Sequence, residues 1–192
     1  MTDSAGRPAL HDARSRIIDA GVACVIRDGV HGASMSAIAA ESNVSKSLLH
    51  YHFVDRAQLI AEVVTALGKG LVEREHGALE RGKALRAVDL VWHWLHAELE
   101  RGELYALLEL RTIRDAPVQA ALEQIAGARH TAAVATVNRL FSRLDLTPRV
   151  PVELIGMATV AFIDGLTLNH ESVPDTRVAF DVFWLAILSL GD

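Results

Sequence analysis

The pattern of apolar residues between positions 34 and 53 predicts two very short helices joined by a tight turn. In the first helix, Ile38 and Ala39 are spaced to face inward, and Ser34 precedes them as an N-cap whose hydroxyl can accept a free backbone N–H. Asn43 follows this stretch, and Asn tolerates the left-handed conformation of a helix end better than any residue except Gly. The first helix is therefore expected to end in a turn at Asn43.

The second short helix is expected over residues 45–52, with Ser45 as its cap. It buries only Leu49 and Phe53, an apolar pair at i, i+4 spacing. Its remaining positions face outward and combine hydrogen-bond donors, aromatic and aliphatic groups: Lys46, Ser47, Leu48, His50, Tyr51 and His52. A helix that exposes this combination is suited to contact a partner, and the pair of helices is interpreted as a helix-turn-helix.

The residues before this helix-turn-helix also have apolar positions at helical spacing. Apolar positions recur with helical period over residues 12–28, and Gly29 is expected to end that scaffold helix. Residues 1–11 contain Gly6 and Pro8, which oppose helix formation, so this segment is expected to be a flexible arm.

The remaining residues contain several long helical patterns and no strand pattern. Asp55 is placed to cap a helix that is expected to end near Gly68 or Gly70. The further helices are expected over residues 83–101, 103–114, 117–144, 152–170 and 175–190. The sequence therefore predicts an all-α fold.

Composition restricts the class of protein. The chain has 192 residues, of which 51% are apolar, and its single cysteine, Cys24, cannot form an intrachain disulfide. The polar N-terminus does not resemble a secretory signal, and no uncharged run approaches the roughly 20 residues that a membrane span needs. We therefore expect a cytoplasmic protein that does not insert into a membrane.

The net charge of −5 is unevenly distributed. Residues 1–56 carry six Lys or Arg and six acidic residues, whereas residues 57–192 carry 13 and 18. A neutral N-terminal part can still bind DNA when its basic residues share one face, although its non-specific affinity is expected to be modest.

A resemblance to a known family rests on a scaffold helix followed by Ile38, Ala39, Asn43, Val44, Ser45, Leu49 to Phe53, Asp55, Arg56 and Leu59. In this register, residues 12–60 resemble the N-terminal domain of TetR-family transcriptional regulators. Three positions depart from the family pattern. Asn43 replaces the Gly of the turn, Arg56 replaces a Lys, and His50 replaces the first Tyr of the Tyr-x-x-Phe signature, where imidazole can still donate one hydrogen bond.

The resemblance implies a DNA-binding domain over residues 1–56 and a helical regulatory and dimerisation domain over residues 57–192. It places Lys46, Ser47 and Leu48 at base edges in the major groove of double-stranded operator DNA. It places the phosphate contacts on Met35, Ser36, His50, Tyr51, His52 and Arg56.

The last two predicted helices have more apolar surface than one packed face needs. In the family, the corresponding helices form a four-helix bundle in a homodimer, and small residues allow close approach. The expected dimer-interface residues are Leu154, Ala158, Ala161, Gly165, Phe180, Phe183, Trp184 and Ile187.

An apolar cavity for a small-molecule effector is expected among the other helices of residues 57–192. Its expected lining residues are Trp92, His96, Leu99, Tyr105, Leu108, Arg111, Thr112, Phe141 and Phe162. The resulting hypothesis is a repressor that binds a pseudo-palindromic site as a homodimer and is released by an apolar effector.

Two alternatives stay open at this level. One is a regulator without a ligand, whose C-terminal domain serves only dimerisation. The other is an enzyme that uses the C-terminal histidines, but the sequence has no Gly-x-Ser-x-Gly elbow and no glycine-rich phosphate loop. No catalytic residue, metal or cofactor is expected.

Overall fold

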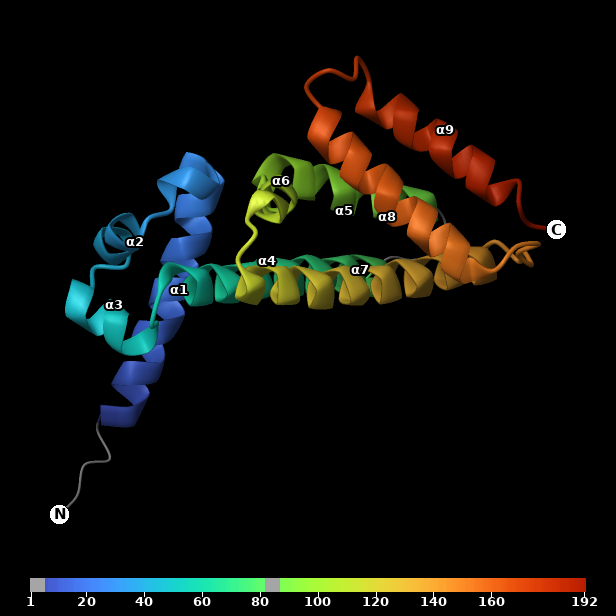
Figure 1. The fold of residues 1–192 in the computed structure, drawn as a ribbon. Helices are drawn as coiled ribbons and strands as arrows, with labels where there is room; N and C mark the ends of the chain where they lie inside the picture. Colours follow the sequence, from blue (N-terminus) through green and yellow to red (C-terminus); the bar gives the residue numbers. More distant parts are fainter. Residues whose placement is uncertain (1–5, 82–86) are drawn as a thin grey trace. The chain divides into compact units, whose positions relative to one another are not determined.

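The computed structural model describes residues 6–81 and 87–192, and these residues form an all-α fold (Figure 1). The helices are α1 (Gly6–Gly32), α2 (Met35–Glu41), α3 (Lys46–His52), α4 (Arg56–Arg81), α5 (Ala87–Arg101), α6 (Glu103–Glu109), the 3₁₀ turn η2 (Leu110–Thr112), α7 (Ala116–Arg143), α8 (Val152–Asn169) and α9 (Thr176–Leu188). Extended pairing within the described ranges is limited to an isolated bridge between Pro148 and Gly191. The predicted all-α class is confirmed.

The chain forms two compact units. The first comprises the described residues up to Leu67 together with Glu109–Glu123, and the second comprises Gly68–Leu108 and Gln124–Asp192. The helices α4 and α7 each contribute to both units. The first unit extends beyond the boundary predicted after residue 56 because the start of α4 packs within it, for example with Val63 against Gly21 of α1. The functional boundary at residue 56 stays a prediction.

The helix-turn-helix forms from the local signals that the sequence contains. Ser34 Oγ accepts the Ala37 backbone N–H at 3.2 Å, and Ser45 Oγ accepts the Leu48 N–H at 3.1 Å. Asn43 adopts the left-handed conformation with φ 52°. These contacts begin both helices and turn the chain between them, as predicted.

The core of the first unit joins α1, α2, α3 and α4. Its fully buried side chains include Ile17, Ile38, Leu49, Phe53 and Leu59. Because Leu49 and Phe53 turn inward, the opposite side of α3 faces away from the core.

Two predicted helix limits are wrong. Residues 6–11 were expected in the arm but belong to α1, while residues 1–5 lie outside the described residues. Gly29 does interrupt the helix, with φ 70°, although a helical turn continues to Gly32.

The helix α4 does not end at Gly68 or Gly70 but runs to Arg81. A Cβ atom at Gly68 would collide with the Ile125 side chain, so this glycine allows close packing of α7 on α4.

The second unit contains α8 and α9 as an antiparallel pair (Figure 1). Asp175 caps α9 by accepting the Val178 N–H at 3.0 Å, as the register predicts. Phe141, Phe180 and Trp184 are buried in this unit. The start of the helix predicted at residue 83 lies outside the described residues, which resume as helix at Ala87.

Candidate nucleic-acid interface and ligand cavity

The outward side of α3 carries the residues predicted to read DNA. Lys46, Ser47, His50 and Tyr51 are exposed, with 71% of Tyr51 accessible, and Leu48 is partly exposed. At the start of α2, Ser36 is exposed and Met35 is half-buried. The structure therefore brings these donors and apolar groups onto the surface of one helix-turn-helix.

His52 differs from the other predicted contacts because it is half-buried. Its ring meets the edge of Tyr51 at a centroid separation of 5.3 Å. Its Nε2 atom is buried and has no hydrogen-bond partner in the described part of the chain. His52 therefore offers less of its ring to a phosphate than a fully outward position would.

Arg56 has partners that the sequence did not indicate. Its Nε donates to the Ala33 carbonyl oxygen at 3.0 Å, and its Nη2 donates to the Val30 carbonyl oxygen at 2.5 Å. These carbonyls belong to the segment that leads from α1 into α2. One edge of the Arg56 guanidinium therefore connects α4 to this segment. Only its remaining N–H groups are available for the predicted phosphate contact.

The residues predicted to line an effector cavity differ in their surroundings. Leu108 and Phe141 are buried, Phe162 stacks on Phe183 with ring centroids 4.1 Å apart, and Trp92 contacts Phe180 at 5.2 Å. The side chains of His96, Tyr105, Arg111 and Thr112 are exposed, and Leu99 is intermediate. Some of these residues pack in the core and others face solvent, and their role in ligand binding stays a prediction.

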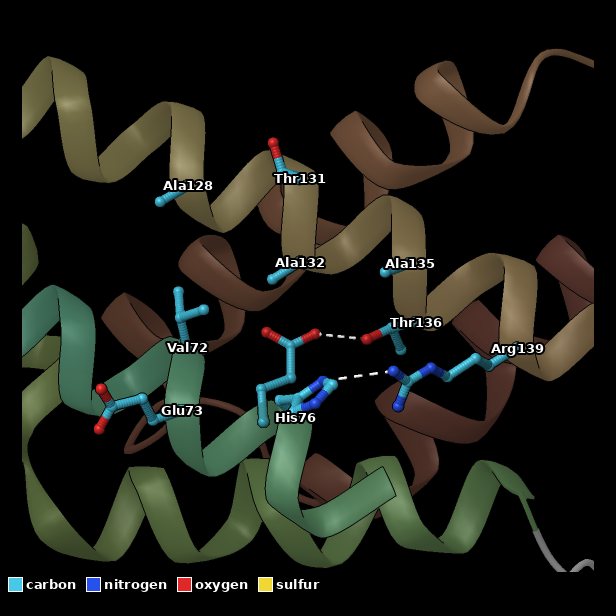
Figure 2. A pocket seen from close by; sticks show the side chains of 10 residues that line it. Val72, Glu73, His76, Ala128, Thr131, Ala132, Ala135, Thr136 and Arg139 are labelled. Carbon is cyan, nitrogen blue, oxygen red and sulfur yellow. Dashed lines mark hydrogen bonds between the residues drawn. The ribbon is translucent and has the colours of Figure 1, made fainter. Parts of the chain in front are cut away.

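A cavity of about 510 Å³ that is partly open to solvent lies between the second halves of α4 and α7 (Figure 2). Its lining residues are Val72, Glu73, Glu75 and His76 from α4, with Ala128, Thr131, Ala132, Ala135, Thr136 and Arg139 from α7. The sequence did not indicate this cavity, because an alanine on a helix can either pack against a neighbouring helix or leave an empty space beside it.

Glu75 is the buried polar group of this cavity. Only 9% of the residue is exposed, and Thr136 Oγ1 donates to its Oε1 at 2.6 Å (Figure 2). Burial raises the pKa of the carboxyl above its ordinary value of 4.5, and the Thr136 hydrogen bond and the Arg129 charge only partly oppose this rise. The carboxylate form of Glu75 is therefore destabilising in the folded protein.

We expect Glu75→Gln to raise the free energy of unfolding at pH 7.5 by about 1 kcal/mol, because Gln keeps an acceptor for Thr136 without a buried charge. Since the folded protein raises this pKa, wild type loses stability as the pH rises above about 4.5 through the folded-state value. The difference between the variants should therefore shrink toward pH 4.5, as measured by urea unfolding across that range. A pH-independent difference, or a less stable Gln variant, would contradict this expectation.

The apolar surface of α8 agrees in part with the predicted dimer interface. Leu154, Ala158, Ala161 and Gly165 are exposed, and a Cβ atom at Gly165 would meet no heavy atom within 4 Å. Met157 and Leu168 of the same helix are 58% and 54% exposed. By length and composition alone α8 could also cross a membrane, and a third of its span (33%) is buried inside the protein.

On α9 the predicted interface residues are mostly covered within the protomer. Phe180, Trp184 and Ile187 are buried within the protomer, and Phe183 is half-buried against Phe162. The large apolar side chains that α9 exposes are Val178, Val182 and Leu185, at 55%, 62% and 69%. The correction follows from packing, because the aromatic residues fill the space between α9 and its neighbours α5 and α8.

Metal-ligating residues do not gather in the described ranges, where no group of three or more His, Cys, Asp or Glu side chains could hold an ion. The exposed His96 lies 3.5 Å from Glu100 on the same helix. The described histidines of the second unit therefore do not form a metal cluster.

Comparison with known proteins supports a specific class for the first unit. Residues 17–63 match the family model described as bacterial regulatory proteins, tetR family. This match covers the second part of α1, the helix-turn-helix and the start of α4.

A protein relative and two solved structures extend this result. The chain is 33% identical over 86 residues to the HTH-type nicotine-responsive transcriptional repressor HdnoR of Paenarthrobacter nicotinovorans, a match that spans 42% of this chain but only 44% of that repressor. A TetR transcription regulator from Haloarcula marismortui superposes with a TM-score of 0.77 at 19% identity, over 95% of this chain and 100% of that one. The Bacillus subtilis transcriptional regulator FadR, solved with stearoyl-CoA, gives a TM-score of 0.69 at 15% identity, over 90% and 97%.

The exposed face of α3 and the family match identify a helix-turn-helix of the kind that bacterial transcriptional regulators contain. Residues 17–63 belong to the tetR family of bacterial regulatory proteins.

Proposed function

We propose that the whole chain is a TetR-family regulator: a homodimeric, cytoplasmic repressor that binds a pseudo-palindromic operator and is released by a small, largely apolar effector. The observation that carries the DNA-binding part is the outward face of α3, which exposes Lys46, Ser47, His50 and Tyr51. The assignment as a repressor is supported by the 33% identity to a protein named as a transcriptional repressor.

In this proposal, α3 enters the major groove with its N-terminal residues toward the base edges. Lys46 and Ser47 donate hydrogen bonds, and Leu48 can touch a thymine methyl group. His50 and Tyr51, with Ser36 on α2, contact phosphates and set the position of the helix. The caps at Ser34 and Ser45 support this arrangement by fixing where both helices begin.

Lys46→Ala should lower operator affinity by about 1 to 3 kcal/mol and relax specificity at one base position, because Lys46 is our candidate for a guanine contact. Fluorescence anisotropy with operator duplexes that carry single base changes measures both effects. The matched control is Lys69→Ala, which removes an exposed lysine outside the helix-turn-helix. Unchanged base selectivity in Lys46→Ala would show that this side chain contacts only the backbone.

Homodimer formation is supported by the apolar face of α8 and by Val178, Val182 and Leu185 of α9. These side chains face solvent in the protomer, and exposed contiguous apolar surface marks interaction sites. A two-fold axis would present two α3 helices to half-sites whose centres are separated by about 34 to 36 Å or a multiple of that distance.

Release by an effector requires that the ligand bind the DNA-free arrangement more tightly than the operator-bound one. The helix α4 contributes to both compact units, so a ligand against its second half contacts the same helix that follows α3. The coupling expected for such regulation is about 1 to 3 kcal/mol. Equal affinity of a ligand for free and operator-bound protein would contradict this mechanism.

Selection of bound duplexes from a random DNA pool tests the proposed function directly. We expect a consensus with two inverted half-sites, together with a complex that contains two or more protomers. A single half-site bound by one protomer would overturn the dimeric arrangement, and failure to enrich any sequence would overturn sequence-specific DNA binding.

A second candidate is a regulator without a small-molecule ligand. The burial of Phe141 and the stacking of Phe162 on Phe183 favour it, because these side chains fill space that an effector was predicted to occupy. The cavity between α4 and α7 favours ligand binding instead.

A further inference from the structure

We propose that the cavity between α4 and α7 binds an organic cation with an apolar body, and that the Glu75 carboxylate is its counter-ion. The regulatory consequence, effector release from DNA, rests on the proposed function, whereas the binding itself does not. The ligand class follows from the shape of the cavity and from the charges that surround it.

The cavity has the size and surface of a small-molecule site. Its volume of about 510 Å³ lies within the range of roughly 300 to 1,000 Å³ that is common for ligand pockets. Ala128, Ala132 and Ala135 of α7 lie opposite Val72 of α4 (Figure 2). Small side chains on one wall and an aliphatic one on the other leave space for an apolar body.

Glu75 gives this apolar space a single buried acidic group. Its Oε1 accepts the Thr136 hydroxyl, and in the described part of the chain no Lys, Arg or His nitrogen forms an ion pair with it. Arg129 acts on Glu75 through its charge, but its guanidinium is paired with Asp164 through Nη2 and Oδ1 at 2.5 Å. Arg129 therefore shares its single positive charge between Glu75 and Asp164.

A cation beside Glu75 would supply a counter-ion of its own. A buried carboxylate without a counter-ion is costly, and an ammonium group in the cavity would offset part of that cost. In the same position, the apolar body of the ligand would cover Val72 and the alanines of α7, so its burial would add to the affinity.

The other charged groups at the cavity also favour a cation over an anion. The lining contains the carboxylates Glu73 and Glu75 against one guanidinium, Arg139. Arg139 Nη2 lies 3.3 Å from His76 Nδ1, and Figure 2 shows these two side chains pointing toward each other. An anionic ligand would have to lie beside Glu75 to fill the apolar part.

The test uses three probes of similar shape and different charge: benzyltrimethylammonium, neopentylbenzene and benzylsulfonate. Isothermal titration of the full chain at pH 7.5 should show that the cation binds about tenfold or more tightly than the neutral probe, as expected for a contact with a buried carboxylate. Binding of the anion should be weaker than binding of the neutral probe. Neither the quaternary cation nor the sulfonate changes its charge with pH.

Two glutamate variants distinguish the effect of the buried Glu75 carboxylate from the effect of a negative charge elsewhere on the protein. Glu75→Gln should reduce the preference for the cation to about twofold or less, while the neutral probe keeps its affinity. Glu123→Gln makes the same charge change at an exposed position of α7 that does not line the cavity, and it should change either affinity less than about twofold. Ala132→Leu, which narrows the cavity from α7, should weaken both the cation and the neutral probe.

Each outcome is decisive. The proposal is overturned if the anion binds best, if the cation preference survives in Glu75→Gln, or if no probe binds to the wild-type chain. Operator binding is measured in parallel without probe. Cation binding without operator binding would leave the site intact and refute the proposed function, whereas operator binding with no cation preference would refute only this site.

Discussion

Leu185→Asp should convert the protein from a dimer to a monomer and lower operator affinity by about 100-fold or more, because two linked half-site contacts become one. Leu185 is the most exposed of the large apolar side chains on α9, at 69%. A carboxylate at this position would have to lose its hydration in an apolar interface, which is costly. The loss of the apolar contacts of Leu185 would weaken the dimer further. Sedimentation equilibrium and operator titration measure the two effects.

The control for this variant is Ala126→Asp, which adds the same charge at an exposed position of α7. It should remain dimeric and bind operator normally. Circular dichroism of Leu185→Asp should keep the helical signal, since this side chain is not part of the protomer core. If Leu185→Asp is still a dimer with normal operator affinity, the exposed face of α9 is not the interface.

Arg56→Ala should destabilise the protein by about 2 to 3 kcal/mol, because it removes two charge-assisted hydrogen bonds to the carbonyl groups of Val30 and Ala33. These bonds connect α4 to the segment that precedes the helix-turn-helix. The loss should appear in urea unfolding without DNA, and operator affinity should fall together with stability.

Arg56→Lys distinguishes the structural role from the predicted phosphate contact. Lysine keeps the charge but lacks the planar fork that reaches both carbonyls, so we expect it to restore little of the stability. If Arg56 only contacted a phosphate, the Arg56→Lys variant would largely keep operator affinity, and both variants would have normal stability. That result would assign Arg56 to the DNA interface, as the sequence predicted.

The helix-turn-helix could be predicted from sequence because its signals are local. The caps at Ser34 and Ser45, the left-handed Asn43 and the i, i+4 pair Leu49 and Phe53 each act within a few residues. Short-range hydrogen bonds and helical periodicity decide such elements wherever the chain packs. The exposed side of α3 follows directly, since burying Leu49 turns Lys46, Ser47 and His50 outward.

The sites in the second unit depended on partners that are distant in sequence. An aromatic stripe shows that α9 has an apolar face, but it does not show whether α5 and α8 or a second protomer covers it. Phe180 and Trp184 are covered within the protomer. The large apolar side chains that remain exposed on α9 are the aliphatic residues Val178, Val182 and Leu185. Gly68 is a similar case, because only the position of Ile125 shows that it serves packing instead of ending a helix.

The sequence by itself determined the all-α class, the helix-turn-helix and the residues that α3 presents, because these follow from periodicity, capping and turn chemistry within short stretches. The tertiary structure alone decided that Arg56 holds backbone carbonyls, that α9 exposes its aliphatic face, and that Glu75 is buried beside a cavity. The physical reason is that burial and charge environment are properties of the surroundings. A glutamate in a helix is expected to be solvent-exposed until the neighbouring helix, here α7, is placed against it.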